Sequence, residues 1–288
     1  MIYDAAIIGT GPAGVSAALT LKANEKNFIW IGSKAFSDKV GRAERIANYP
    51  GLPMVTGAEM NEVFRRQCEE RGITIEDRMV TSIVKFGDHY ALTAGSEFYE
   101  TYTVIFATGV TAVGLLPGEA ELVGKGVSYC ATCDGFLYKG KTIAVICNAK
   151  RFEHEVEFLA RLAEKVYYFP LYKDPGQFPA NVELMDERAV KMNAENGKFA
   201  SLTLKNGETI PASGVFCLRD SVSLATLLPG LATEQGHIAV DRKMVTNLPG
   251  CFAAGDCTGR PYQYVKAAGE GNVAAHSAIA YLAQKDKQ

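Results

Sequence analysis

The stretch that decides the fold is DAAIIGTGPAG, residues 4–14. A short apolar strand, Asp4–Ile8, runs into a turn with glycine at positions 9, 11 and 14. An alanine-rich segment follows, which we expect to form a helix from about Val15 to Ala23. Glycines at this spacing let the backbone approach a pyrophosphate, and the helix N-terminus favours the phosphate charge. The stretch therefore predicts a dinucleotide-binding βαβ unit, whose binding loop is Gly9, Gly11, Pro12, Ala13 and Gly14.

The second strand of this unit, Asn27–Ile31, lacks the acidic residue that would bond an adenosine ribose at its end. Gly32 and Ser33 stand there instead. We therefore expect Ser33 or the backbone to make this contact.

Patterns of a strand followed by a glycine turn or a helix recur along the chain. The expected elements are strands at 103–109, 141–146, 166–169 and 250–256, helices at 152–163 and 265–282, and a hairpin at 201–211. Repetition in both halves predicts an α/β fold of two Rossmann-like, three-layer domains. The proline-glycine stretch at 116–119 indicates a crossing between them. We expect a discontinuous first domain at 1–114 and 236–288, and a second domain at 115–235.

The bulk composition is that of a globular protein. The 288 residues are 48% hydrophobic and 22% charged, enough to bury a core in each of two domains. A net charge of −2 gives no sign of the basic face that binds nucleic acid, and no apolar run is long enough to cross a bilayer. The first residues lead at once into a strand, which leaves no room for a signal peptide. We expect a cytoplasmic protein with neither nucleic acid nor membrane as a partner.

Two of the seven cysteines, Cys130 and Cys133, form a C-x-x-C motif followed by Asp134. A zinc site would need a second Cys or His pair, but the other cysteines and the four histidines are scattered. A buried structural role for the two cysteines would not explain the Asp and Gly that follow. The redox interpretation has a mechanism: two thiols at this spacing can close a disulfide at a helix start, where the dipole lowers a thiol pKa. Asp134 then offers an acid/base group for the protons of thiol–disulfide exchange.

Gly255 and Asp256 follow another apolar strand. An aspartate at the mouth of a Rossmann domain could hold the ribityl hydroxyls of a flavin. It could also serve as an ordinary helix N-cap.

Together these motifs resemble the low-molecular-weight thioredoxin reductases over nearly the whole chain. The matching segments are Gly9–Gly14, Asn48–Gly51, Thr108–Gly109, Lys125–Gly135 and Ala254–Asp256. The resemblance implies a homodimer with non-covalent FAD, an FAD-binding first domain and a disulfide-bearing second domain. It also implies FAD contacts at Asn48, Thr108, Gly109, Gly255, Asp256, Gln263 and Tyr264, of which the last two lie where the family has an Arg-Gln pair.

The resemblance assigns a role to each residue of the redox motif. Cys133 would face the flavin, Cys130 would attack the disulfide of the partner protein, and Asp134 would move protons. The catalytic residues are therefore expected to be Cys130, Cys133 and Asp134.

The chain departs from this family where NADPH would bind. The family's Gly-x-Gly-x-x-Ala positions are occupied by Cys147, Ala149 and Phe152, and its His-Arg-Arg by residues 170–172, Pro-Leu-Tyr. These side chains cannot replace a bidentate guanidinium on a 2′-phosphate. The later Ala-Ile-Gly turn has become Leu-Arg-Asp at residues 218–220. The second domain is thus expected to resemble a degenerate NADPH-binding domain.

This combination resembles the ferredoxin-dependent flavin thioredoxin reductases, a branch independent of pyridine nucleotides. It implies reduced ferredoxin as the donor and thioredoxin as the acceptor, with FAD between them. The alternatives are an NADPH-dependent thioredoxin reductase with a degenerate site, a diflavin disulfide oxidoreductase, and a flavin/dithiol redox sensor. Because ferredoxins are acidic, candidate docking residues are the basic side chains Arg42, Arg45, Lys150, Arg151, Lys165 and Lys173.

Overall fold

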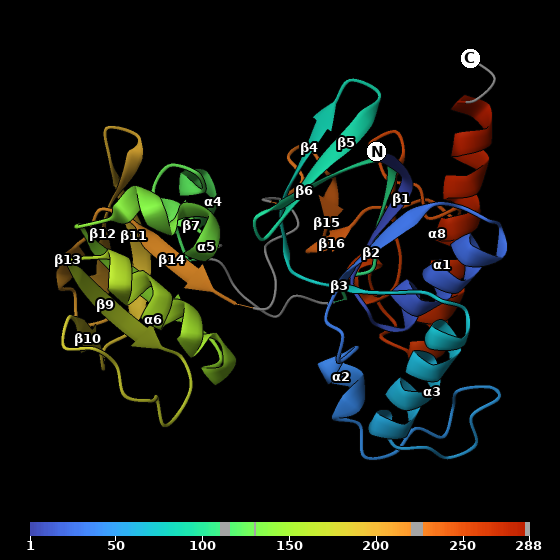
Figure 1. Ribbon diagram of the computed structural model, residues 1–288, viewed down its shortest axis with the longest axis horizontal. Coiled ribbons are helices and arrows are strands. Elements are labelled where there is room, and N and C mark those ends of the chain that lie inside the picture. The colour runs from blue at the N-terminus through green and yellow to red at the C-terminus, as the bar shows by residue number, and fades with distance from the viewer. Residues whose placement is uncertain (110–115, 130, 220–226, 286–288) are drawn as a thin grey trace. The chain divides into compact units, whose positions relative to one another are not determined.

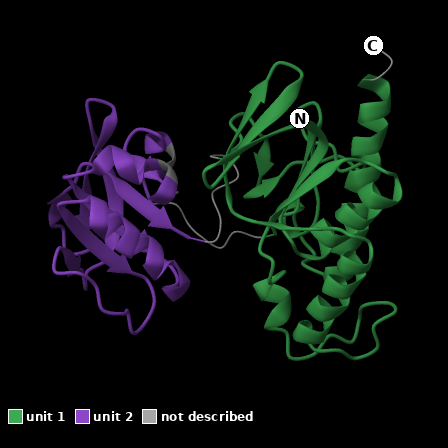
Figure 2. Cartoon of the chain, viewed as in Figure 1, with its two compact units in different colours: residues 1–112, 227–288 green, residues 113–226 purple. Residues whose placement is uncertain are grey.

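The computed structural model describes residues 1–109, 116–129, 131–219 and 227–285 (Figure 1). The chain divides into two compact units, unit 1 at 1–112 with 227–288 and unit 2 at 113–226 (Figure 2). The first unit is therefore discontinuous, as predicted. Its second segment starts at Leu227 rather than at residue 236, and includes the short strands β15 (Thr233–Glu234) and β16 (His237–Ile238).

Unit 1 is organised around a sheet whose parallel strands run in the order β3-β2-β1-β6-β17. These strands are β1 (Ile2–Ile8), β2 (Phe28–Gly32), β3 (Glu76–Asp77), β6 (Glu97–Phe106) and β17 (Cys251–Ala253). The first half of β6 instead pairs with an antiparallel hairpin, β5 (His89–Ala94) with β4 (Val80–Phe86). Because β17 comes from the end of the chain, the C-terminal segment completes the sheet.

Three long helices lie along one side of the parallel strands (Figure 1): α1 (Pro12–Ala23), α3 (Gly57–Glu70) and α8 (Tyr264–Lys285). Proline at the first position of α1 suits a helix start, and α3 begins with a full capping box between Thr56 and Glu59. Short helical turns, α2 (Asp38–Gly41) and η3 (Asp256–Thr258), follow β2 and β17.

The core of unit 1 joins the two ends of the sequence. Ile7 of β1, Leu21 of α1, Met60 of α3, Phe252 of β17 and Ala275 of α8 belong to one buried cluster. Small residues on α1 and α8 allow these two helices to pack closely, so the glycine turn before α1 lies against the C-terminal helix.

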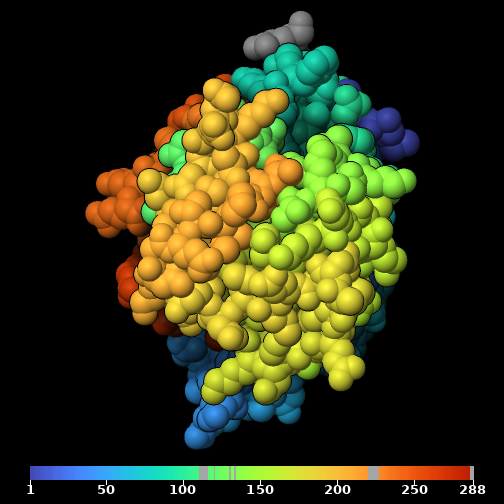
Figure 3. Space-filling model, turned by 90° about the vertical axis from the view of Figure 1, so that its left-hand side faces the viewer, coloured from blue at the N-terminus to red at the C-terminus, as the bar shows by residue number. Residues whose placement is uncertain are grey.

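Unit 2 contains a five-stranded, all-parallel sheet in the order β10-β9-β8-β14-β7. Its strands are β7 (Val127–Ser128), β8 (Thr142–Cys147), β9 (Lys165–Pro170), β10 (Val182–Leu184) and β14 (Val215–Leu218). A second, antiparallel sheet comprises β11 (Ala189–Glu195), β12 (Lys198–Leu204) and β13 (Thr209–Pro211). Figure 3 faces this unit, coloured green to orange, and shows its segments packed into a continuous surface.

The helices of unit 2 are short except for α6 (Glu153–Leu162), which packs on β8 and β9 through Val156 and Leu159. The others are α4 (Glu119–Leu122), α5 (Ala131–Asp134), η1 (Gly135–Tyr138) and η2 (Lys150–Phe152). The α/β fold of two Rossmann-like units is thus confirmed. The predicted helix at 152–163 starts at Glu153, because residues 150–152 form a separate 3₁₀ turn.

Candidate functional site

The predicted binding loop is a tightly packed turn with one open position. A Cβ on Gly9 (φ +108°) would lie 2.3 Å from the Ala107 carbonyl oxygen, and one on Gly14 would lie 2.0 Å from the Gly9 oxygen. Both glycines are therefore required by close backbone packing. At Gly11 a Cβ would meet no atom nearer than 3.9 Å, so this position leaves room for a ligand.

The turn points the start of α1 into that open space. The first intrahelical bond runs from Val15 N to Gly11 O (3.0 Å), and the first turn consists of uncharged residues. The N–H groups of Ala13 and Gly14 have no acceptor within the helix, so they can bind a pyrophosphate. The sequence-based prediction missed Trp30. Its indole Nε1 donates a hydrogen bond to Gly9 O at 2.9 Å, and this buried contact stabilises the turn.

The end of β2 places Gly32 and Ser33 beside this loop. A Cβ on Gly32 would come within 2.9 Å of Thr10 Cγ2, and Ser33 Oγ accepts a hydrogen bond from Ala35 N (3.1 Å). The hydroxyl of Ser33 thus stabilises its own turn. A carboxylate is nevertheless close by, because Gly32 pairs with Asp77 of β3 and Asp77 Oδ1 accepts from Lys34 N (3.3 Å). Asp77 is therefore a candidate ligand for the ribose. It is far from Gly32 in the sequence, but the pairing of β2 with β3 brings it to the site.

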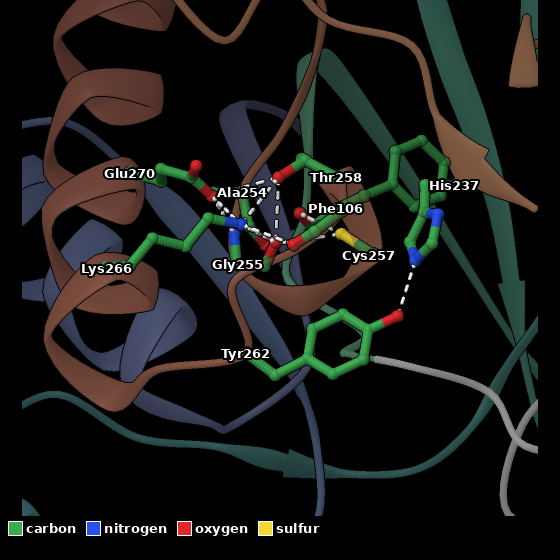
Figure 4. A network of polar contacts seen from close by, with 10 residues as sticks. Phe106, His237, Ala254, Gly255, Cys257, Thr258, Tyr262, Lys266 and Glu270 are labelled. Carbon is green, nitrogen blue, oxygen red and sulfur yellow. Dashed lines mark hydrogen bonds and ion pairs between the residues drawn. The ribbon is translucent and has the colours of Figure 1, made fainter. Parts of the chain in front are cut away.

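A second loop, Gly255–Gly259, meets the first through α8. The ammonium of Lys266 donates to Gly255 O and Gly259 O, both at 2.9 Å, and pairs with Glu270 at 3.0 Å. Glu270 accepts in turn from Gly255 N at 2.8 Å. Figure 4 shows both side chains reaching from α8 toward the loop, where Thr258 also joins the network. We call Lys266 and Glu270 the α8 clamp, since the pair holds the loop at both ends.

Two glycines contact Ala13 at the start of α1: Gly255 from this loop and Gly271 from α8. A Cβ on Gly255 (φ +89°) would lie 3.0 Å from Ala13 Cβ, and one on Gly271 would lie 2.1 Å from Ala13 O. The two predicted binding loops therefore converge on the first turn of α1.

Asp256 does not serve as the N-cap of η3, since that position belongs to Gly255. Its carboxylate instead accepts a hydrogen bond from Lys39 Nζ at 2.6 Å. Lys39 also lies 5.1 Å from the ring centroid of Tyr262, whose hydroxyl is 2.6 Å from His237 Nε2 (Figure 4). The carboxylate of Asp256 is thereby held at the edge of the loop, in reach of sugar hydroxyls.

Asn48 and Gln263, far apart in sequence, come together at the start of α8. Asn48 Nδ2 donates to Gln263 Oε1 at 2.9 Å, and Tyr264 is the first residue of the helix. The helix N-terminus and these two amides offer donors and acceptors to a planar heterocycle.

Thr108 and Gly109 end the described part of the segment after β6. Among the residues that the structure describes, Thr108 Oγ1 is buried and has no hydrogen-bond partner of normal geometry; the neighbouring Cys257 thiol donates to the carbonyls of Phe106 and Ala254. Buried hydroxyls are almost always paired, so an orphaned one indicates a missing polar partner. The residues of unit 1 thus fit a dinucleotide with a heterocyclic end: Gly255 lies against Ala13 at the start of α1, and Asn48 meets Gln263 at the start of α8.

The dithiol motif lies at α5 in unit 2. Cys130 and the side chain of Cys133 lie outside the described residues. Asp134 ends α5, and Gly135 follows under α6, where a Cβ would meet Phe158, Leu159 and Leu162 at 3.1–3.2 Å. The short helix therefore packs tightly on α6. Beside it, Phe136 and Leu137 are 64% and 66% exposed.

The start of α6 is the position at which a second dinucleotide would place its phosphates. There the carboxylate of Glu153 accepts from Tyr172 OH (2.7 Å) and Gly176 N (2.8 Å). Tyr172 continues the chain of hydrogen bonds to Tyr168 OH at 2.5 Å. The first residue of α6 thus carries a carboxylate that is held at this end of the helix by Tyr172 and Gly176, although it makes no capping hydrogen bond to the helix itself.

The remaining cysteines are buried and unpaired: Cys68, Cys147, Cys217, Cys251 and Cys257. Burial raises the pKa of the Cys68 and Cys257 thiols to about 11 and that of Cys217 and Cys251 to about 12. Over residues 1–109, 116–129, 131–219 and 227–285, no group of His, Cys, Asp and Glu could hold a metal ion. Within the same ranges, none of the helices has the length and apolar character needed to cross a membrane.

Comparison with known proteins shows similarity over most of the chain. The family model of the pyridine nucleotide-disulphide oxidoreductases matches residues 3–148 and 179–271. The thioredoxin reductase of Helicobacter pylori is 33% identical over 309 residues, which covers 98% of this chain and 99% of that protein. The thioredoxin reductase of Listeria innocua is 31% identical over 300 residues, with 98% and 94% covered.

Among solved structures, a ferredoxin-flavin thioredoxin reductase from Clostridium acetobutylicum superposes with a TM-score of 0.92. It is 43% identical, and the match covers 100% of both chains. A thioredoxin reductase from Gloeobacter violaceus has a TM-score of 0.80 and 27% identity, over 98% of this chain and 94% of the other.

Proposed function

Because the chain belongs to the pyridine nucleotide-disulphide oxidoreductase family and is a homologue of its thioredoxin reductases, we propose that it is a thioredoxin reductase driven by reduced ferredoxin rather than by NADPH. It is an oxidoreductase with FAD as its cofactor. The likeness to the clostridial ferredoxin-flavin enzyme supports the choice of donor.

The observation that carries the proposal is the carboxylate of Glu153 at the start of α6. At an effective dielectric constant of about 20, two like charges about 4 Å apart repel by on the order of 4 kcal/mol. A nucleotide phosphate would meet this repulsion at the helix N-terminus that normally attracts it. The gap in the family match, residues 149–178, contains this same element.

FAD would be held in unit 1. The pyrophosphate would bind at the start of α1, the ribityl hydroxyls at Asp256, and the pyrimidine edge at Gln263 and Tyr264. The chemistry that FAD supplies when bound is acceptance of single electrons and delivery of two to a disulfide. Asn48 and the α8 clamp would keep these groups in place.

The working disulfide would be Cys130–Cys133. Two electrons and two protons convert it into two thiols, with Asp134 moving the protons. Cys130, as thiolate, then attacks the disulfide of thioredoxin to form a mixed disulfide. Cys133 displaces the thioredoxin sulfur, which re-forms the Cys130–Cys133 bond and releases reduced thioredoxin. Electrons balance, because one disulfide is formed for each one broken.

The exposed pair Phe136 and Leu137 supports a protein as the acceptor. Two large apolar side chains next to a redox dithiol offer a contact surface for the region around a partner's disulfide. The homodimer and the cytoplasmic location implied by the sequence belong to the same proposal.

An anaerobic comparison of electron donors tests it. We expect reduced ferredoxin to bleach the flavin band and to drive thioredoxin reduction, while millimolar NADPH and NADH leave the flavin oxidised. Flavin reduction by NADPH at turnover rates would refute the choice of donor. Counting FAD per chain in the same preparation separates this enzyme from a diflavin oxidoreductase, and multiple turnover separates it from a redox sensor.

A further inference from the structure

One completely buried carboxylate contacts three separate segments of unit 2. Glu119, the first residue of α4, is 0% exposed. Its Oε1 accepts from Tyr129 OH at 2.8 Å and from Arg219 Nη2 at 2.5 Å, and its Oε2 accepts from Leu116 N at 3.0 Å. The guanidinium of Arg219 lies 5.3 Å from the ring centroid of Tyr129, so these two donors also contact each other. We call Glu119, Tyr129 and Arg219 the Glu119 tether.

Sheet pairing explains why these segments meet. Strands β7 and β14 are parallel neighbours, with Ser128 opposite Phe216. The residues that follow the two strands therefore leave the sheet at the same edge, which brings Tyr129 beside Arg219. Both side chains are almost fully buried, at 4% and 6% exposed.

The three segments matter because of what adjoins them in the chain. Tyr129 directly precedes Cys130. Leu116 is the first described residue after the chain passes from unit 1 into unit 2, and Arg219 is the last before it passes back. One carboxylate thus ties the redox segment to the entry and the exit of its unit.

Stability alone does not explain such an arrangement. A buried ion pair contributes little net stability, and apolar residues of similar volume often serve as well or better. Breaking one by removing a single partner, by contrast, is strongly destabilising. Burial and the charge of Glu119 raise the pKa of Tyr129, so the phenol stays a hydrogen-bond donor to the carboxylate at all physiological pH values.

We propose that the Glu119 tether positions the dithiol: it fixes Tyr129, the residue directly before Cys130, and so restricts the conformations open to the chain when the disulfide forms. This inference rests on the proposed role of the two cysteines as a redox couple. A segment already fixed at Tyr129 loses less conformational entropy when the disulfide closes. The tether therefore favours the oxidised form, and loosening it shifts the equilibrium toward the dithiol.

The test measures the redox equilibrium of the holoenzyme in dithiothreitol buffers. Free thiols are trapped by alkylation, and mass spectrometry then gives the fraction of Cys130 and Cys133 that is reduced. Tyr129→Phe removes one hydroxyl from the tether. We expect it to shift the equilibrium about three- to tenfold toward the dithiol, which raises the potential by about 15 to 30 mV. Arg219→Lys keeps the positive charge but loses the contact of the planar guanidinium with the Tyr129 ring. We expect it to shift the redox equilibrium by less than Tyr129→Phe does.

Tyr168→Phe is the matched control, since Tyr168 is a fully buried tyrosine of the same unit with a hydrogen-bonded hydroxyl. It should lower the melting temperature and leave the potential unchanged. The double variant Glu119→Leu/Arg219→Met replaces the ion pair by apolar side chains. We expect it to fold with some loss of stability, because the Tyr129 hydroxyl and the Leu116 N–H lose their acceptor, and still to show the shifted potential, which a purely structural pair would not.

Several results would overturn the inference. A wild-type potential in Tyr129→Phe, an equal shift in Tyr168→Phe, or a normal potential in the double variant would each do so. If Tyr129→Phe fails to fold, Arg219→Lys and the double variant decide the question. A wild-type enzyme without a reversible Cys130–Cys133 disulfide would instead refute the proposed function, so the two failures are distinguishable.

Discussion

At the scale of single residues, burial lowers the reactivity of the five thiols outside the C-x-x-C motif. The thiolate is the reactive form, and a thiol with a pKa of about 11 is about one part in a thousand thiolate at pH 8. We predict that iodoacetamide at pH 8 modifies Cys130 and Cys133 of the reduced protein and spares the other five cysteines. Because burial raises the pKa of these thiols, labelling of Cys68 and Cys257 should increase only as the pH approaches 11.

Peptide mass spectrometry of the labelled protein measures this, and the unfolded chain, in which all seven cysteines should react, is the control. Rapid modification of Cys68 or Cys257 in the native protein would contradict the assigned burial.

The two thiols of the motif should differ in a second experiment. The resemblance to thioredoxin reductases assigns Cys133 to the flavin side, so we expect Cys130→Ser, which leaves Cys133 as a free thiolate, to show a long-wavelength charge-transfer absorption band. Cys133→Ser should lack that band and lose electron transfer from flavin to the dithiol. A band seen in Cys133→Ser alone would mean that the roles of the two cysteines are reversed.

At the scale of elements, the α8 clamp links a helix to a cofactor loop. Lys266→Met removes two hydrogen bonds from an ammonium to loop carbonyls, each worth about 1.5–3 kcal/mol. We predict that FAD dissociates at least tenfold more readily, as measured by fluorescence titration of the apoprotein. Lys285→Met, at the other end of the same helix, is the control and should bind FAD normally. Wild-type affinity in Lys266→Met would show that the loop does not need the clamp.

The sequence predicted best those elements whose signals are local. The strand, glycine turn and helix at residues 4–23 were confirmed, because glycine spacing and apolar pattern suffice to specify them. Helix α3 was missed although Thr56 and Glu59 form a readable capping box. The hairpin β4–β5 was also missed.

Contacts between distant segments could not be predicted in the same way. Asn48 and Gln263 are far apart in the chain, and nothing in either neighbourhood indicates their hydrogen bond. Likewise, Phe152 predicted a degenerate nucleotide loop, but only the folded chain brings Tyr172 and Gly176 to Glu153. Such contacts follow from strand order and helix packing rather than from local pattern.

At the scale of the whole molecule, the docking of ferredoxin should depend on charge. Steering by opposite charges raises association rates and is screened by salt, with a Debye length of about 10 Å at 0.1 M. We predict that turnover driven by ferredoxin falls steeply as salt rises, whereas thioredoxin reduction by chemically reduced enzyme changes less. Lys165 is a weaker candidate than the sequence suggested, because it pairs with Glu183 at 2.8 Å.

Charge reversal locates the surface. Arg42 lines a cleft of about 510 Å³ between α2 and α3, together with Arg65. Reversal of Arg42 and Arg45, or of Lys150 and Arg151, should reproduce the effect of salt at one of these two surfaces. Turnover that is flat with salt and insensitive to both reversals would rule out electrostatic docking there.

The close fit of Gly271 against Ala13 also bears on how the protein is made. The glycine turn is synthesised before unit 2, but the helix that supports it is synthesised only after unit 2. At about 5–20 residues per second, the nascent N-terminal segment waits for many seconds without its packing partner. Unit 2, encoded without interruption, can fold during this interval. We therefore expect stable binding of FAD only after α8 has been synthesised, and the apolar face of α1 is exposed to chaperones until then.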